Sequence, residues 1–122
     1  KKPFKAKIVT ETTYRDNHVP HRELAGTVTQ VEKYLFHLNR WGPAGEAELT
    51  RRFKRQLPSG LQVRIVNPCG LIVMGRDDDL TAPQKADFEV FRRQNKNVID
   101  VVTYDDLLRR LQRLLEQLGS GH

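Results

Sequence analysis

The stretch RELAGTVTQVEKYLFHLN, residues 22–39, decides how the rest of the chain can fold. Its apolar residues recur at spacings of three and four, the pattern of an amphipathic helix with one buried face. They are Leu24, Val28, Val31, Leu35 and Leu38. Gln30, Tyr34 and His37 fall on a neighbouring stripe that the core does not need. The stretch therefore predicts a long helix that carries a separate polar stripe.

This helix is expected to end at Trp41-Gly42-Pro43-Ala44-Gly45, because Gly tolerates a left-handed cap and Pro cannot continue the hydrogen-bond ladder. A shorter helix is expected from Glu46 to Gln56, followed by a turn. It carries a cationic cluster made of Arg51, Arg52, Lys54 and Arg55. We expect this cluster to contact phosphate groups, and a solvated charged face is the ordinary alternative.

Little regular structure is expected in the residues that precede the long helix. Alternating Phe4, Ala6 and Ile8 indicate a short strand, and residues 10–21 are expected to form a loop because they are polar and contain turn-forming residues. On the C-terminal side, strands are expected over 61–66, 71–74 and 98–102. The uniformly apolar 71–74 is expected to be a central strand buried on both faces.

Two capping boxes mark the remaining helices. Thr81 with Gln84 begins a helix that runs to about Asn95, and Thr103 with Asp106 begins the last one. The last helix has one broad apolar face, formed by Leu107, Leu108, Leu111, Leu114, Leu115 and Leu118. The order of elements predicts one α/β domain over residues 1–118, with helices on a mixed sheet and a flexible end at 119–122.

Composition narrows the class of partner. The chain has 122 residues and a formal charge of +6, which favours an anionic partner such as nucleic acid or a membrane surface. No apolar run is long enough for a membrane span, and the lone Cys69 lies among apolar residues, where a small core residue is expected. A single cysteine suits a reducing compartment, so we expect a cytoplasmic protein.

Other candidate metal ligands are weak. Asp77, Asp78 and Asp79 follow a strand and precede a helix, where turn formation and the helix dipole explain acidic residues. His18 and His21 have a spacing that zinc could use, but they lack a Cys or a third ligand nearby. Neither group is expected to bind a metal.

The motifs resemble a known group of nucleases. Gln30-x-x-x-Tyr34, on a helix after a strand that ends in Lys-x-Pro, resembles one branch of the PD-(D/E)xK nuclease superfamily. Three later segments resemble the C-terminal nuclease domain of Shedu-type anti-phage defence proteins. They are Leu71–Arg76, Leu80-Thr81 with Gln84, and Val101–Leu108. The likeness covers almost all of residues 1–118 and implies a restriction-endonuclease-like mixed sheet flanked by helices.

The resemblance also implies a site. Lys1-Lys2-Pro3 matches the end of the family's Glu-x-Lys strand, so Lys1, or less favourably Lys2, corresponds to the catalytic lysine, with Gln30 and Tyr34 beside it. The family's acidic ligands for Mg²⁺ or Mn²⁺ would then precede residue 1. The implied activity is metal-dependent DNA cleavage in the complete protein, with His37 and the cationic cluster contacting DNA.

Two other classes of function remain open. A non-catalytic module with a nuclease-like fold could bind nucleic acid, or assemble a homo-oligomer through the leucine-rich last helix. A Glu two positions before Lys1 and an acid on the preceding strand would favour the enzyme over this module. A small-ligand enzyme is the least supported class, since the chain has no Gly-rich phosphate loop.

Overall fold

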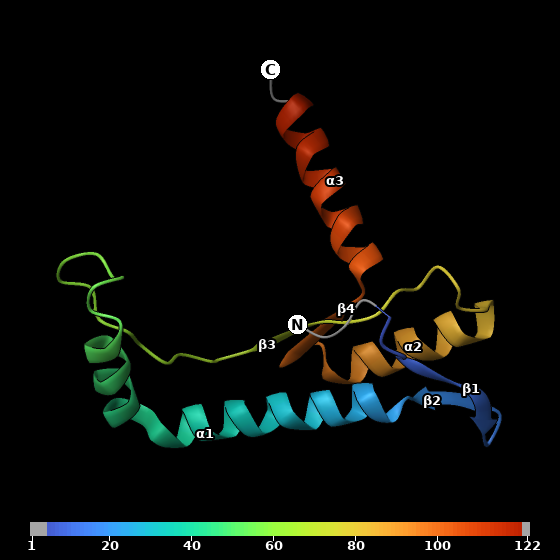
Figure 1. The fold of residues 1–122 in the computed structure, drawn as a ribbon, viewed down its shortest axis with the longest axis horizontal. Helices are drawn as coiled ribbons and strands as arrows, with labels where there is room; N and C mark the ends of the chain where they lie inside the picture. The colour runs from blue at the N-terminus through green and yellow to red at the C-terminus, as the bar shows by residue number, and fades with distance from the viewer. Residues whose placement is uncertain (1–4, 121–122) are drawn as a thin grey trace.

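The computed structural model describes residues 5–120 and has a mixed α/β fold (Figure 1). Its elements are β1 (Val9–Tyr14), β2 (Asn17–Pro20), α1 (Arg22–Arg52), β3 (Gly70–Val73), α2 (Ala82–Asn95), β4 (Ile99–Val102) and α3 (Tyr104–Ser120). The predicted α/β class is confirmed. Within the described residues the strands form two separate two-stranded sheets rather than one mixed sheet. The predicted catalytic residue Lys1 lies outside the described residues.

The first sheet corrects the loop expected over residues 10–21. β1 and β2 pair antiparallel across a tight turn in which Arg15 and Asp16 have φ values of 50° and 62°. Two successive positive φ values are typical of the hairpin turns that match strand twist. The turn-forming residues are therefore the tip of a hairpin. The mostly exposed β1 and the partly exposed β2 lack the apolar alternation that would have revealed them.

α1 has the predicted buried face and the predicted break. Leu24, Val28 and Leu35 are buried, and Val31 and Leu38 pack against the same core. At Gly42 the backbone leaves helical geometry, with φ 56° and ψ −141°. The helix then resumes in a new direction as far as Arg52 and forms an elbow, which Figure 1 shows as a sharp bend.

The strand expected over 61–66 is absent, because this segment bonds to a helix instead of to another strand. The N–H groups of Val63 and Ile65 donate to Oγ1 of Thr50, at 2.8 Å, and to Oε2 of Glu46, at 2.9 Å. Helix positions four apart rise about 6 Å, close to the span of two extended residues. The segment therefore lies extended along the second half of α1 without a ladder.

The second sheet contains the strands expected at 71–74 and 98–102. β3 and β4 are parallel and joined by α2, with Ile72 paired to Val101. Ile72, Val101, Val102 and Phe88 are buried, but Leu71 is 58% exposed. β3 is therefore covered on one face only, contrary to the central strand that was expected, and Cys69 just before it is exposed rather than in the core.

Both predicted capping boxes are confirmed. Oγ1 of Thr81 accepts from the N–H of Gln84, and Oγ1 of Thr103 accepts from the N–H of Asp106. In return, Oε1 of Gln84 accepts from the N–H of Thr81, and Oδ2 of Asp106 accepts from the N–H of Thr103. α3 begins at this second box, contacts β4 and then projects away from the body as far as Ser120 (Figure 1).

Candidate functional site

The predicted polar stripe of α1 is exposed. Gln30, Tyr34 and His37 are all exposed, and Tyr34 is 58% exposed. The structure brings Tyr34 and His37 together in an open hollow, whose other lining residues are Leu38, Arg40 and Trp41. Gln30 lies one turn before Tyr34 and does not line this hollow. The stripe is thus accessible to a macromolecular ligand, as its proposed role requires.

Trp41 is held in this hollow by the elbow of α1. Gly45 follows one turn later, and a Cβ at Gly45 would lie 2.8 Å from Cε3 of Trp41 and closer still to Cγ and Cδ2. The indole therefore packs directly on the backbone at Gly45. The predicted helix break thus fixes an aromatic ring beside Tyr34, which the sequence pattern did not indicate.

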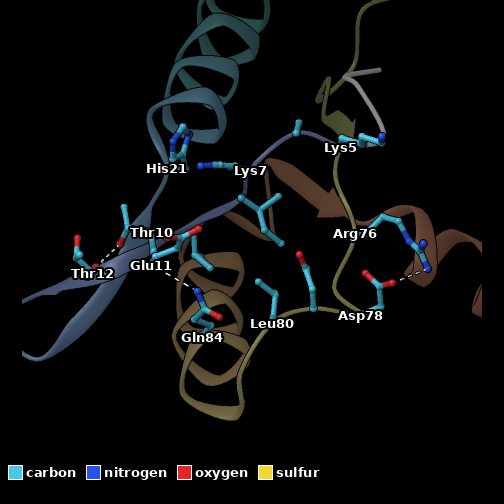
Figure 2. Close-up of a pocket in the computed structure, with 14 residues that line it drawn as sticks. Lys5, Lys7, Thr10, Glu11, Thr12, His21, Arg76, Asp78, Leu80 and Gln84 are labelled. Carbon is cyan, nitrogen blue, oxygen red and sulfur yellow. Dashed lines mark hydrogen bonds and ion pairs between the residues drawn. The ribbon is translucent and has the colours of Figure 1, made fainter.

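A second concave region lies around residues 5–12, which lead into β1 (Figure 2). It has a volume of about 720 Å³ and is lined by Lys5–Thr12, His21, Arg76, Asp78–Leu80 and Gln84. Sequence reasoning missed this cleft, because its walls come from segments about 70 residues apart. Buried Gln84 joins the walls by donating from Nε2 to the carbonyl of Thr10 at 3.2 Å.

The cleft has mixed charge. Within residues 5–120, the side chains of Lys5 and Lys7 make no ion pair or hydrogen bond, so both remain available to an anion. Glu11, Asp78 and Asp79 line the same region, and Asp78 is already paired with Arg76 at 3.1 Å. The balance of charges does not favour an anion over a cation.

The part of the chain that the structure describes offers no ligand set for Mg²⁺ or Mn²⁺. It contains no group of three or more His, Cys, Asp or Glu residues placed to hold a metal ion. His18 and His21 have other contacts: Nδ1 of His18 lies 2.8 Å from the carbonyl of Thr10, and Nδ1 of His21 accepts from Glu23 N–H. These residues alone do not fit a metal site.

The acidic residues around the start of α3 belong to an ion network. Arg109 donates to Asp77 at 2.5 Å and to Asp106 at 2.6 Å. Arg76 donates to Asp105 at 2.9 Å, and the hydrogen bond from Arg76 is the main cause that holds the pKa of Asp105 below its ordinary value. The Asp77 carboxylate thus connects the loop after β3 to α3. Asp105 and Asp106 likewise have a structural role.

The cationic cluster is exposed, but its members are not equivalent. Arg51 and Arg52 share Glu48, at 2.6 Å and 3.4 Å, and the hydrogen bond from Arg51 lowers the pKa of that carboxyl. Lys54 and Arg55 have no ion pair within residues 5–120. Lys54 and Arg55 therefore carry the charge most available to phosphate groups.

No helix among the described residues is both long enough and apolar enough to cross a membrane.

Two comparisons with known proteins give the same result. The family described as "Shedu protein SduA, C-terminal" matches residues 1–108 of this chain. The Shedu protein SduA of Bacillus cereus (strain B4264) is 31% identical over 115 residues, which are 91% of this chain. The chain spans 28% of the length of that relative. The matched range includes Lys1, Gln30 and Tyr34, together with both concave regions.

Proposed function

Because the chain belongs to the Shedu protein SduA C-terminal family, we propose that it is part of a metal-dependent DNA endonuclease of antiviral defence. The observation that carries the proposal is the family match over residues 1–108, which takes in Lys1-Lys2-Pro3 as well as the exposed Gln30 and Tyr34 stripe. The reaction is hydrolysis of a phosphodiester bond.

In this proposal the metal is held elsewhere in the longer protein. The described residues supply no ligand set, so Mg²⁺ or Mn²⁺ is assigned to acidic residues before Lys1. A restriction-endonuclease-like sheet would likewise need more strands. β3 pairs only with β4 among the described strands, so its other edge is available to a strand from outside this range.

The residues of this chain then bind and orient the substrate. Lys1 places a positive charge beside the scissile phosphate, Gln30 orients a water or the lysine through its amide, and Tyr34 donates its hydroxyl proton to a phosphate oxygen. Lys54 and Arg55, together with His37 of the stripe, contact the DNA backbone. Such contacts give affinity without sequence readout and weaken as salt rises.

The test is metal-dependent cleavage of supercoiled plasmid by the full-length protein. Gln30→Ala and Tyr34→Phe are each expected to lower the rate by about 10- to 100-fold, the effect of losing one hydrogen bond to a charged group. Gln94→Ala on α2 and Tyr14→Phe on β1 are matched controls, because both residues are exposed and lie outside the stripe. Wild-type rates for both stripe variants would remove the site assignment.

One observation favours a second candidate, a non-catalytic module that binds nucleic acid or assembles subunits. Five leucines of α3 are largely exposed, namely Leu108, Leu111, Leu114, Leu115 and Leu118. An apolar face of this kind is typical of a helix that packs against another protein surface. The residues that precede Lys1 discriminate between the two candidates: a Glu two positions before it and an acid on the preceding strand favour the enzyme.

A further inference from the structure

The hollow at the elbow of α1 has the composition of a stacking site. Tyr34, His37, Leu38 and Trp41 are spaced three, one and three residues apart, so they lie on one face of the helix. Tyr34 is 58% exposed and Trp41 is 40% exposed. Together with Arg40, these residues line a region of about 650 Å³. Two large aromatic rings are thus available at the surface without being part of the core.

The rings of Trp41 and His37 are held in place before any ligand arrives. The indole of Trp41 lies against Gly45 across the bend, so its position depends on the elbow and not on a flexible loop. The imidazole of His37 meets Phe36 edge-on, with ring centroids 5.6 Å apart. Rings that are already ordered lose little side-chain entropy on binding, which favours stacking of a planar ligand.

The charge around the hollow favours an anionic ligand. Arg40 lines it and makes no ion pair within the described range. From Arg40 to Arg55 the chain has five cationic and two acidic side chains, and both acidic ones, Glu46 and Glu48, already have partners. The aromatic faces therefore lie at the start of residues 40–55, a segment that is positively charged as a whole.

We propose that this elbow hollow binds the unpaired bases of single-stranded DNA, with Tyr34 and Trp41 stacking on bases and Arg40 contacting a phosphate. Aromatic platforms beside a positively charged surface are the usual means of binding single strands, whereas bases inside a duplex are already stacked on one another. The inference deepens the proposed function, since it names the form of DNA presented to the stripe that contains Tyr34.

The binding experiment uses the full-length protein and fluorescently labelled oligonucleotides. The probes are a single strand, the matching duplex, and a strand of equal length in which abasic spacers replace the bases. Tyr34→Leu and Trp41→Leu are each expected to weaken binding of the normal single strand by roughly 5- to 100-fold, the effect of losing one base stack. Trp41→Leu is expected to leave binding of the abasic strand at the wild-type value, because the phosphates and their contacts are unchanged. Tyr34→Leu is expected to weaken binding of the abasic strand no more than Tyr34→Phe does, since both variants lose the same hydroxyl.

Two further variants separate stacking from loss of structure. Tyr34→Phe keeps the ring but loses the hydroxyl that contacts a phosphate, so it is expected to bind the single strand more tightly than Tyr34→Leu does, even though it is expected to cleave more slowly. Tyr14→Leu is the matched control, since Tyr14 is 62% exposed and has Arg15 above its ring, but lies on the hairpin. It is expected to leave binding unchanged.

Three results would overturn the inference. The first is wild-type binding of the single strand by both leucine variants. The second is equal weakening with the normal and the abasic strand, which would trace the loss to folding or to charge alone. The third is a lower melting temperature of both leucine variants, while each still prefers the normal strand to the abasic strand as much as the wild type does. This result is expected if another part of the protein covers the hollow. Absence of cleavage in the wild type and in every variant would contradict the proposed function. It would not affect the binding results, which test the inference separately.

Discussion

At the scale of single residues, the three glycines of α1 differ in whether the structure requires a glycine at that position. Gly42 adopts φ 56° and ψ −141°, a conformation that costs other residues of the order of 1–3 kcal/mol. Gly45 leaves room for the Trp41 indole. Gly26 has helical geometry and nothing within 4 Å of an added Cβ. Only the glycines at the elbow are therefore required by the structure.

Replacing these glycines by alanine should change stability in opposite directions. Gly45→Ala is expected to lower the free energy of unfolding by about 1–3 kcal/mol, because the new methyl group overlaps Trp41. Gly26→Ala is expected to raise it by up to about 1 kcal/mol through higher helix propensity. Urea unfolding of the two variants measures both values. Changes of the same sign would contradict the described elbow.

At the scale of elements, the attachment of α3 depends mainly on ionic contacts around its first turn. No residue of α3, from Tyr104 to Ser120, is buried, and the helix has few contacts besides those with β4. Burial raises the pKa of Asp106, but hydrogen bonds from Arg109 and from Thr103 N–H, with the charges of Arg92 and Arg109, outweigh it and lower that pKa. The folded protein therefore favours the charged carboxylate.

This network predicts a loss of stability in acid. Because the pKa values of Asp105 and Asp106 are lowered from 3.8, their contribution is present above about pH 4 and is lost as the pH falls through the lower folded values. Asp106→Asn is expected to cost about 1–3 kcal/mol at pH 7 and to reduce the dependence on pH below 4. Thermal melting at several pH values measures this.

The matched control is Glu116→Gln, a neutralised carboxylate near the other end of the same helix. Glu116 is exposed and accepts only a long hydrogen bond from Gln112, at 3.4 Å, within the described part of the chain. It is expected to melt like the wild type between pH 3 and pH 7. If Asp106→Asn also melts like the wild type throughout this range, the network does not stabilise α3.

At the scale of the whole molecule, the leucine face of α3 is an apolar surface that the described fold leaves uncovered. Tyr104, Leu107, Leu111, Leu114 and Leu118 alternate at spacings of three and four, the heptad pattern of helices that pack side by side. Leu108 and Leu115 widen this stripe and are exposed. An apolar stripe of this kind is self-complementary, so a second copy of α3 is a suitable partner.

We therefore expect the full-length protein to form a homo-oligomer that depends on α3. Burying one leucine stabilises an assembly by about 1.5–3 kcal/mol, so Leu111→Glu should weaken association at least about tenfold. Gln117→Glu introduces the same charge outside the leucine stripe and should leave association unchanged. Light scattering coupled to gel filtration gives the mass of each. A monomeric wild type, or an unchanged Leu111→Glu assembly, would contradict this role for α3.

The sequence by itself determined the buried face of α1 and the starts of α2 and α3, whereas α1 continues past its expected end as a bent helix and ends at Arg52 rather than Gln56. The spacing of Leu24, Val28 and Leu35 gave the buried face of α1, and the boxes at Thr81 and Thr103 gave the starts of α2 and α3. These features were predictable because helix periodicity, capping and glycine or proline breaks depend on residues close together in the chain. The shared stripe of Gln30, Tyr34 and His37 follows from the same local spacing. Their place in a site comes from the family resemblance and stays a prediction.

Only the tertiary structure decided the features that depend on distant partners. Residues 61–66 have a strand-like sequence, yet the N–H groups of Ile65 and Val63 donate hydrogen bonds to the side chains of Glu46 and Thr50 instead of to another strand. Cys69 has apolar neighbours in sequence but is exposed, and Leu71 is exposed because β3 is covered on one face only. Packing of Trp41 on Gly45, which places an aromatic ring beside the stripe of Tyr34, likewise appears only after the helix bends. The physical reason is the same in each case: burial and backbone hydrogen bonding depend on which segments meet in space, and a pattern along the chain does not contain that information.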